Sequence, residues 1–451
     1  MHKDDLRVNC RIESALLQQW LPEAVLDSQI GAITGVCLDS RVLQPGDLFF
    51  AIKAARDGHD FVQGALDKGA AAVVVDHDMH LPRQIIVAHT LQSLHELAKQ
   101  YRQAWSGIVV GVSGSNGKTT TKEMLHTLLG EEAFSTPGTW NNHLGIPLSL
   151  LMLRPAHHIA VIEMGINQFG DLESYCQYAM PDIGVLTVIG DSHLMHLKNR
   201  EGVLKAKSEL FACLPQDGIA VINIDDPYLS TLQEKLTVDI VTVSAQTQAD
   251  VFVELVSDQT IKVQYGQQQI ETAFHLGGQH NRNNLACALG VAMACGKTIN
   301  EIQDRIAMIK PLDMRMQEYK TDEDIRIIVD CYNANPTSTM AGLTMVSTLP
   351  GRKVVLLGDM LELGEQSSKM HMDLARKLFD LGIDQVFLLG QFAKDYYQGA
   401  LLGGLQESQI HLLDDRKSAY EKIHTQLQSG DILYVKGSRG MRLEEIIAPW
   451  I

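Results

Sequence analysis

A stretch typical of a phosphate-binding loop lies at residues 108–123. It reads Ile-Val-Val-Gly-Val-Ser-Gly-Ser-Asn-Gly-Lys-Thr-Thr-Thr-Lys-Glu, a β-branched strand followed by a loop of small residues and the start of a helix. In such a loop, backbone N–H groups and the helix N-terminus bind phosphate oxygens, the lysine reaches the β- and γ-phosphates, and the hydroxyl that follows it ligates Mg²⁺. We therefore expect an ATP site formed by Gly114, Ser115, Asn116, Gly117, Lys118, Thr119 and Thr120, with Thr119 as a metal ligand.

The loop departs from the common spacing at one position. That spacing places a glycine five residues before Gly117, where this chain has Val112, and the glycines stand instead at 111 and 114. The alternative is a glycine-rich turn without function. The strand before the loop and the helical pattern after it favour the ATP site.

A second candidate is a lysine in an apolar stripe. Residues 201–211 predict a helix with an apolar stripe formed by Val203, Leu204, Leu210 and Phe211. Lys207 stands at the one position of this stripe that lacks an apolar residue, whereas Lys205 points to the polar side of the helix. Burial favours the neutral amine, which reacts with a carbonyl or with CO₂. The alternative is a lysine whose stem packs while its ammonium group reaches water.

Two polar side chains stand where predicted strands end. Glu163 ends the strand-like segment 158–163, and His193 follows the segment 185–192, which begins with the predicted strand 185–188. Ligands gather at the carboxyl ends of strands in open α/β sheets, so Glu163, His193 and a modified Lys207 would suit Mg²⁺ or Mn²⁺. His193 with His196 could instead suggest zinc, although no cysteine or HExxH pattern supports it.

The order of strand-like and helical segments predicts an α/β protein with three domains. Residues 1–104 hold short α/β units, 105–312 alternate strands with helices, and 313–451 return to a regular alternation. We expect a central P-loop-type ATPase domain with a mostly parallel sheet and a C-terminal Rossmann-like domain. Within the central domain, residues 249–276 alternate polar and apolar residues and predict an antiparallel hairpin.

Composition narrows the possible partners. The chain has 451 residues, with 38 Lys and Arg against 54 Asp and Glu, a formal net charge of −16 that argues against general binding to nucleic acid or anionic membranes. Seven cysteines without a C-x-x-C pair argue against a disulfide framework or a structural zinc site. Residues 1–5 lack an apolar signal core and no apolar run could span a bilayer, so a cytoplasmic protein without membrane insertion is expected.

The motifs together resemble those of the Mur ligases, the ATP-dependent amide ligases of peptidoglycan precursor synthesis. The loop with shifted glycines at 111–122 is similar to theirs, and residues 39–51 and 57–61 are similar to the UDP-sugar-binding domain of the two later ligases. Four further segments resemble the member that adds D-alanyl-D-alanine: 278–284, 330–336, 358–364 and 436–444. The Asp-Asn-Pro-Arg sequence usual in the diaminoacid-adding relative is absent.

The resemblance implies a reaction and residue roles. The expected activity is addition of D-alanyl-D-alanine to UDP-N-acetylmuramoyl-tripeptide through an acyl phosphate, with ATP, Mg²⁺ and a CO₂-derived carbamate on Lys207, in a monomer. It implies metal ligation by Glu163 and His193, catalytic roles for these residues with Lys118, Lys207 and Arg315, and ATP contacts from Asn281, Asn284, Arg315, Asp330 and Asn333. The expected substrate contacts are Ser40 and Arg41 for UDP, Asp359 and Arg439 for the dipeptide region, and Asn142.

One segment departs from the family pattern, and three rival functions stay open. Residues 53–56 read Lys-Ala-Ala-Arg and are one residue shorter than the corresponding stretch of relatives, which affects the expected sugar-nucleotide contacts. The rivals are a diaminoacid-adding Mur ligase, a ligase like folylpolyglutamate synthetase, and a nucleotide-dependent switch. The Asp39 to Phe61 segment argues against the synthetase, and the set of Glu163, His193 and Lys207 is surplus to a switch.

Overall fold

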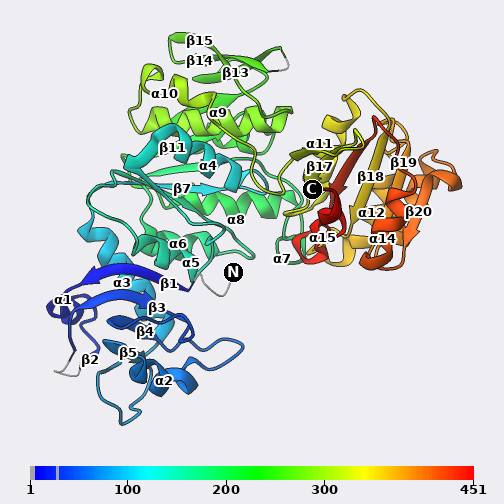
Figure 1. The fold of residues 1–451 in the computed structure, drawn as a ribbon. Helices are drawn as coiled ribbons and strands as arrows, with labels where there is room; N and C mark the ends of the chain where they lie inside the picture. Colours follow the sequence, from blue (N-terminus) through cyan, green and yellow to red (C-terminus); the bar gives the residue numbers. More distant parts are fainter. Residues whose placement is uncertain (1–5, 27–29, 258) are drawn as a thin grey trace.

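The computed structural model describes residues 6–26, 30–257 and 259–451, and it contains three sheets that follow one another along the chain (Figure 1). The expectation about a signal segment at residues 1–5 lies outside the described residues. Within the described part, none of the helices has the length and apolar character needed to cross a membrane.

The first sheet has six strands in the order β1-β3-β4-β5-β6-β2. The four central strands are parallel, and β1 and β2 pair antiparallel at the two edges. The strands are β1 (Arg7–Ile12), β2 (Val25–Leu26), β3 (Ile33–Cys37), β4 (Asp47–Phe50), β5 (Ala72–Val75) and β6 (Gln84–Ile86). The helices are α1 (Ser14–Trp20), η2 (Gly58–Phe61), α2 (Val62–Asp67) and α3 (Thr90–Ala104).

The second sheet has nine strands in the order β15-β14-β13-β12-β11-β10-β7-β9-β8, parallel from β8 to β13. Its strands are β7 (Ile108–Ser113), β8 (Ala133–Ser135), β9 (Ile159–Glu163), β10 (Ile183–Leu186), β11 (Ile219–Asn223), β12 (Asp239–Ser244), β13 (Val251–Ser257), β14 (Thr260–Tyr265) and β15 (Gln268–Ala273). The last three pair antiparallel. The predicted hairpin at 249–276 is therefore confirmed, as a three-stranded extension of the same sheet.

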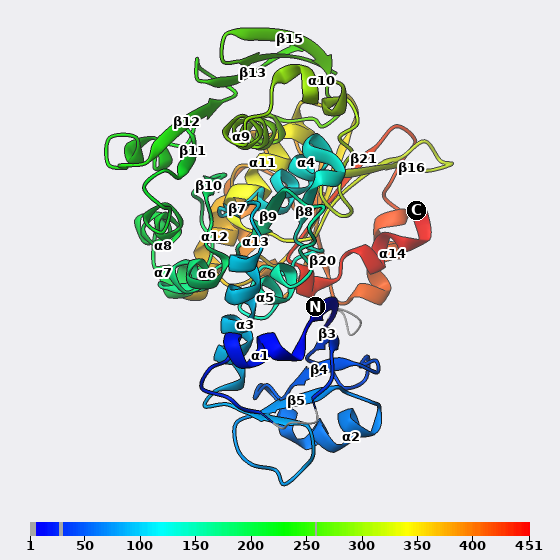
Figure 2. The ribbon, with the colours of Figure 1, turned by 90° about the vertical axis from the view of Figure 1, so that its left-hand side faces the viewer.

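Helices cover both faces of this second sheet. One face packs against α4 (Lys118–Leu129), α9 (Gln279–Ala294) and α10 (Ile299–Ile306). The other packs against α5 (Gly145–Leu150), α6 (Asp171–Ala179) and α8 (Arg200–Ala212), with the short α7 (Leu194–Leu197) beside α8. Helix α3 contacts α5 and α6, so the first sheet and this face share one continuous hydrophobic core (Figure 2).

The third sheet has the order β16-β17-β21-β18-β19-β20, all parallel except the edge strand β16. Its strands are β16 (Gln317–Lys320), β17 (Arg326–Asp330), β18 (Lys353–Gly358), β19 (Gln385–Leu389), β20 (Ile410–Leu413) and β21 (Ile432–Lys436). One face packs against α11 (Pro336–Ser347), α12 (Ser367–Ala375) and α13 (Ala393–Leu402), and the other against α14 (Arg416–His424) and α15 (Glu444–Ile447). The expected α/β class with three sheet-containing parts is confirmed; the boundaries at 104/105 and 312/313 stay predictions.

Two glycines bring α8 close to the second sheet. A Cβ on Gly111 of β7 would lie 2.8 Å from Leu210 Cδ1, and one on Gly184 of β10 would lie 3.2 Å from side-chain atoms of Leu210 and Phe211. Because interiors are packed to crystal-like density, only glycine allows the helix this approach. The close packing of α8 places Lys207 beneath the strand that leads into the phosphate loop.

Replacement of Gly111 by valine tests this packing. The added side chain overlaps Leu210, so Gly111→Val is expected to lower the free energy of unfolding by about 1–3 kcal/mol, measured from urea denaturation. Gly64→Ala in α2 is the control, because a Cβ there meets nothing within 4 Å. Equal stabilities of the two variants would contradict the proposed packing constraint.

Candidate active site

The loop between β7 and α4 contains two glycines with positive φ. Gly114 has φ +144° and Gly117 has φ +80°, and an added Cβ would lie 1.9 Å from Thr187 Oγ1 or 2.2 Å from Asn284 Oδ1, respectively. Gly117 directly precedes α4, so the N-terminus of this helix opens at the loop. Val112, where the common spacing has glycine, lies inside β7 with its side chain in the hydrophobic core. Valine in place of glycine at position 112 therefore does not prevent the loop backbone from approaching a phosphate.

Two cations of the site are held by protein groups. Lys118 Nζ donates to the Gly114 carbonyl oxygen at 2.9 Å, and burial lowers the pKa of this lysine. Arg315 Nη2 donates to Thr119 Oγ1 at 3.0 Å, and its guanidinium group lies 4.2 Å from the centre of the Tyr332 ring. The first residues of α4 and an arginine from beyond α10 are therefore already in contact.

Glu163 is an acid at the end of β9, buried at 1 % exposure. Asn141 Nδ2 donates to its Oε1 at 2.7 Å, while its Oε2 is buried without a partner. A buried carboxylate oxygen without a partner is costly, so this atom is poised for a cation or a donor supplied from outside the chain.

Lys207 is fully buried on α8, and its Nζ has no hydrogen-bond partner. Burial, and then the charge of Lys118, lower its pKa well below the ordinary value. The predicted position in the apolar stripe is confirmed, as is the exposure of Lys205; the alternative in which the Lys207 ammonium reaches water is wrong. The neutral amine that carbamylation requires is therefore favoured here.

His193 lies in the left-handed region, with φ 54°, just before α7. Its Nδ1 is 3.1 Å from Glu362 Oε2, a carboxylate from the third sheet's loops. Burial lowers the pKa of His193, partly offset by Glu362. His196 is exposed, and in the described ranges these two histidines belong to no group of three or more His, Cys, Asp or Glu donors, so the zinc alternative gains no support.

A pocket of about 570 Å³ opens at the phosphate loop, in the range of small-molecule sites. It is lined by many of the predicted ATP-site residues: Ser115, Asn116, Gly117, Lys118, Thr119, Thr120, Glu163, Asn281, Asn284, Arg315, Asp330 and Asn333. Gly114, His193 and Lys207 are not among the lining residues. His193 and Lys207 are nevertheless close enough to Lys118 for its charge to lower their pKa. The pocket brings together residues from the second and third sheets that are more than 200 positions apart.

Two side chains on the far wall of the pocket, Asn281 and Asp330, have defined partners. Asn281 and Asn284, in the first turns of α9, are buried, and Asn281 Nδ2 donates to the Gly277 carbonyl oxygen at 2.8 Å. Asp330 ends β17 and accepts hydrogen bonds from Lys436 Nζ at 2.6 Å and Tyr434 OH at 3.0 Å. Asn333 is exposed. The wall therefore offers amide and carboxylate groups suited to a nucleoside.

The predicted substrate residues lie outside this pocket, and their roles stay predictions. Ser40 and Arg41 follow the first sheet's β3, where Arg41 pairs with Asp39. Asn142 Oδ1 accepts the backbone N–H of Leu144 and Gly145 at the start of α5. The remaining two have local partners: Asp359 accepts the N–H of Gln391 and Phe392, and exposed Arg439 pairs with Glu444.

Sequence reasoning missed several residues that the third sheet brings to the site. Asn335 caps α11, and its amide exchanges two hydrogen bonds with that of Asn116 in the phosphate loop. Glu362 and Lys436 are the others. All three residues lie in the segments 330–336, 358–364 and 436–444, which the sequence already marks as motifs. Only the tertiary fold shows which side chains of these segments face the phosphate loop.

Comparisons with known proteins agree with this architecture. Three family descriptions match the chain: "Mur ligase family, catalytic domain" at residues 32–105, "Mur ligase middle domain" at 112–292, and "Mur ligase, glutamate ligase domain" at 314–439. The chain is 35 % identical over 426 residues to a UDP-N-acetylmuramoyl-tripeptide--D-alanyl-D-alanine ligase of Bacillus subtilis, covering 92 % of each. The chain belongs to the Mur ligase family.

Two crystal structures are similar over nearly the whole chain. MurF from Acinetobacter baumannii has a TM-score of 0.90 at 28 % identity and covers 98 % of this chain and 99 % of its own. MurF ligase from Thermotoga maritima in complex with ADP has a TM-score of 0.83 at 28 % identity and covers 92 % and 96 %. The three-sheet fold is thus that of an ATP-dependent ligase family.

The buried Lys207 amine predicts a pH dependence of stability. Its pKa is lowered in the folded state, so the unfolded chain binds more protons and stability rises with pH, from the lowered folded pKa up to about 10.4. In CO₂-free buffer, the free energy of unfolding is measured against pH by urea denaturation for the wild type and for Lys207→Met. The free energy of the wild type minus that of the variant should rise with pH, with a slope that approaches about 1.4 kcal/mol per pH unit. A difference that does not change with pH would contradict a buried neutral amine.

Proposed function

We propose that this chain joins D-alanyl-D-alanine to UDP-N-acetylmuramoyl-tripeptide, with ATP cleaved to ADP and phosphate. The observation that carries the proposal is that the phosphate loop lies beside two buried groups: Glu163, whose Oε2 has no partner, and Lys207, whose Nζ has none. The name of the Bacillus subtilis relative states the same two substrates, and the Thermotoga maritima MurF ligase was solved in complex with ADP.

ATP would occupy the pocket at the β7–α4 loop. The loop N–H groups and Lys118 would hold the β- and γ-phosphates, which requires Lys118 Nζ to leave the Gly114 carbonyl oxygen. Asn281 and Asn284 would contact the nucleoside with Asn333, and Asp330 the ribose. Arg315 would turn from Thr119 to the phosphates, releasing the hydroxyl.

The residues present fit a divalent cation. Glu163 Oε2 is buried and unpaired, and Thr119, His193 and a carbamate on Lys207 would complete a set of oxygen and imidazole donors of the kind that Mg²⁺ accepts. When bound, Mg²⁺ would neutralise phosphate charge. Glu362 would keep His193 oriented by accepting its Nδ1–H, as carboxylates do for metal-binding histidines.

The reaction needs two successive displacements. A carboxylate oxygen of the tripeptide attacks the γ-phosphorus, the bond to ADP breaks, and an acyl phosphate forms. The amine of the dipeptide then attacks the acyl carbon, phosphate leaves with the former carboxylate oxygen, and the nitrogen loses a proton. Lys118 and the loop amides would stabilise the charge that moves with the phosphoryl group.

The three parts of the chain would divide the substrates. Residues 1–104 would bind UDP through Ser40 and Arg41, 105–312 would bind ATP, and 313–451 would bind the dipeptide through Asp359 and Arg439. Asn142 would contact substrate near α5. We further propose a monomer that works in the cytoplasm, where ATP and sugar nucleotides are made, with neither nucleic acid nor membrane as a partner.

Phosphate release tests the proposal against its rivals. With UDP-N-acetylmuramoyl-tripeptide and ATP present, release should depend on D-alanyl-D-alanine and give a UDP-pentapeptide by mass. Lys118→Met should lower turnover about 10²–10³-fold, because a charge-stabilising donor is lost. Release that requires a diaminoacid, or a folate with glutamate, would favour the rival ligases, and ATP binding without amine-dependent release would favour a switch.

A second prediction concerns the modified lysine. Lys207→Ala is expected to lower turnover about 10²–10³-fold, because the negative oxygens of the carbamate are lost, and added short-chain carboxylates should restore part of it. Lys205→Ala on the same helix is the matched control, since this exposed lysine lies over Phe169 on the surface. Turnover like that of the wild type in Lys207→Ala would refute the role.

A further inference from the structure

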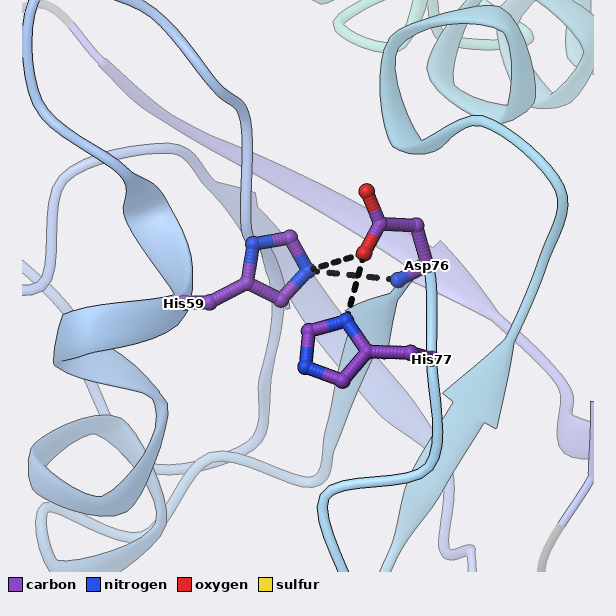
Figure 3. A group of neighbouring side chains, drawn as sticks. All are labelled: His59, Asp76 and His77. Atoms are coloured by element: carbon purple, nitrogen blue, oxygen red, sulfur yellow. Dashed lines mark hydrogen bonds and ion pairs between the residues drawn. The ribbon is translucent and has the colours of Figure 1, made fainter.

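A cluster of metal-ligating side chains lies in the first sheet's part of the chain, outside the candidate active site. Figure 3 shows His59, from η2, with Asp76 and His77, which directly follow β5. One ligand atom from each lies within 4.8 Å of the other two, and this is the one group of three such residues in the described part of the chain. None of them lines the pocket at the phosphate loop.

The cluster converges on one oxygen. Asp76 Oδ1 lies 3.1 Å from His59 Nε2 and 2.7 Å from His77 Nδ1 (Figure 3). The other carboxylate oxygen, Oδ2, pairs with Lys53 Nζ at 2.7 Å. Both carboxylate oxygens of Asp76 are therefore in contact with nitrogen atoms of basic side chains.

The tautomer of His59 is fixed by its neighbours. Its Nδ1 lies 2.6 Å from Asp57 Oδ1, so it donates its proton to that carboxylate. Its Nε2 accepts the backbone N–H of Asp76 at 3.2 Å and therefore carries a lone pair. A carboxylate that holds the distal N–H of an imidazole is the usual support of a metal-binding histidine.

One ring nitrogen of His59 and one carboxylate oxygen of Asp76 thus face each other at short range. His59 Nε2 and Asp76 Oδ1 are 3.1 Å apart, and the hydrogen bond that Nε2 accepts from the Asp76 backbone N–H is long, at 3.2 Å. The side chain of His59 is 6 % exposed, so water screens the contact little. A cation that bound both atoms would be held in this buried contact.

The spacing suits a tetrahedral ion. Ligand bonds of about 2.0 Å place neighbouring ligand atoms about 3.3 Å apart and the centres of two bound imidazole rings roughly 5 Å apart. The rings of His59 and His77 have their centres 5.0 Å apart. The 3.1 Å between His59 Nε2 and Asp76 Oδ1 is close to this spacing of ligand atoms, whereas the 2.7 Å between His77 Nδ1 and Asp76 Oδ1 is a hydrogen-bond distance that would lengthen on metal binding. The side chain of His77 is 58 % exposed, so it can shift in this way, and it leaves an open side for water as fourth ligand.

We propose that His59 Nε2, Asp76 Oδ1 and His77 Nδ1 bind a divalent transition-metal ion of the Zn²⁺ type. Two imidazoles and one carboxylate favour such an ion over Mg²⁺ or Ca²⁺, which prefer oxygen ligands. The ion would tie η2 to the end of β5, and with it the 53–57 segment that is shorter than in relatives. None of the three residues is among those assigned to the ligase reaction, and metal binding is measured without substrates, so its test does not depend on the proposed function.

The test is a Zn²⁺ titration of the full chain in competition with a chromophoric chelator. His77→Ala is the main variant, because this residue is exposed and its loss should leave the fold intact; circular dichroism verifies that. His80→Ala is the matched control, a nearby and still more exposed histidine that pairs with Asp78 and lies outside the cluster. Asp57→Asn tests the support of His59 and should weaken binding about 10–100-fold.

The expected result is one Zn²⁺ per chain in the wild type and in His80→Ala, with more than ~100-fold weaker binding in His77→Ala, since a direct ligand matters more than its support. The same pattern should appear in the zinc-dependent rise of the melting temperature. Absence of binding above the chelator blank would overturn the proposal. So would equal affinity of the wild type and His77→Ala, which would place the ion elsewhere.

Discussion

The burial of the Lys207 amine is the constraint on which the candidate active site depends. An unpaired amine at zero exposure is tolerated only as the neutral base, because the ammonium form would lose its hydration without compensation. Gly111 and Gly184 permit this burial, since they let α8 press against β7 and β10. The same strand β7 then leads into the phosphate loop, so one packing arrangement sets both the chemistry of the amine and its place beneath Lys118.

Several contacts of the site are made between protein groups that also suit a ligand. Lys118 binds the Gly114 carbonyl, Arg315 binds the Thr119 hydroxyl, and Glu362 binds His193. In each contact, a group that could bind a nucleotide or an ion is bound instead to another group of the chain. Arg315 and Glu362 lie beyond α10, so two of these three contacts join the phosphate-loop region to the third sheet's part of the chain.

Local sequence signals predicted the features that depend on neighbours in the chain. The phosphate loop and the buried Lys207 follow from glycine spacing and helical periodicity, and the α/β class follows from the alternation of strands and helices. One strand shifted: residues 185–188 were expected, and β10 spans Ile183–Leu186 because it starts opposite Val110 of β7. Local sequence patterns do not predict the order of the strands within the three sheets.

Contacts between distant segments could not be predicted in the same way. Glu362 beside His193 and Asn335 beside Asn116 join residues of different sheets, which no periodicity records. Asp359 and Arg439, which the motifs predict as substrate residues, have partners within the third sheet's part of the chain, and their substrate roles stay predictions. The His59 cluster likewise appears only when β5 and η2 meet.

The central claim is amide ligation through an acyl phosphate, and oxygen transfer tests it most directly. The reaction would be run with the reacting carboxylate of UDP-N-acetylmuramoyl-tripeptide labelled with ¹⁸O, together with ATP and D-alanyl-D-alanine, and the released phosphate analysed by mass spectrometry. The account predicts one ¹⁸O atom in the phosphate for each pentapeptide formed. Phosphate without the label would contradict it, because the carboxylate would then not have been phosphorylated.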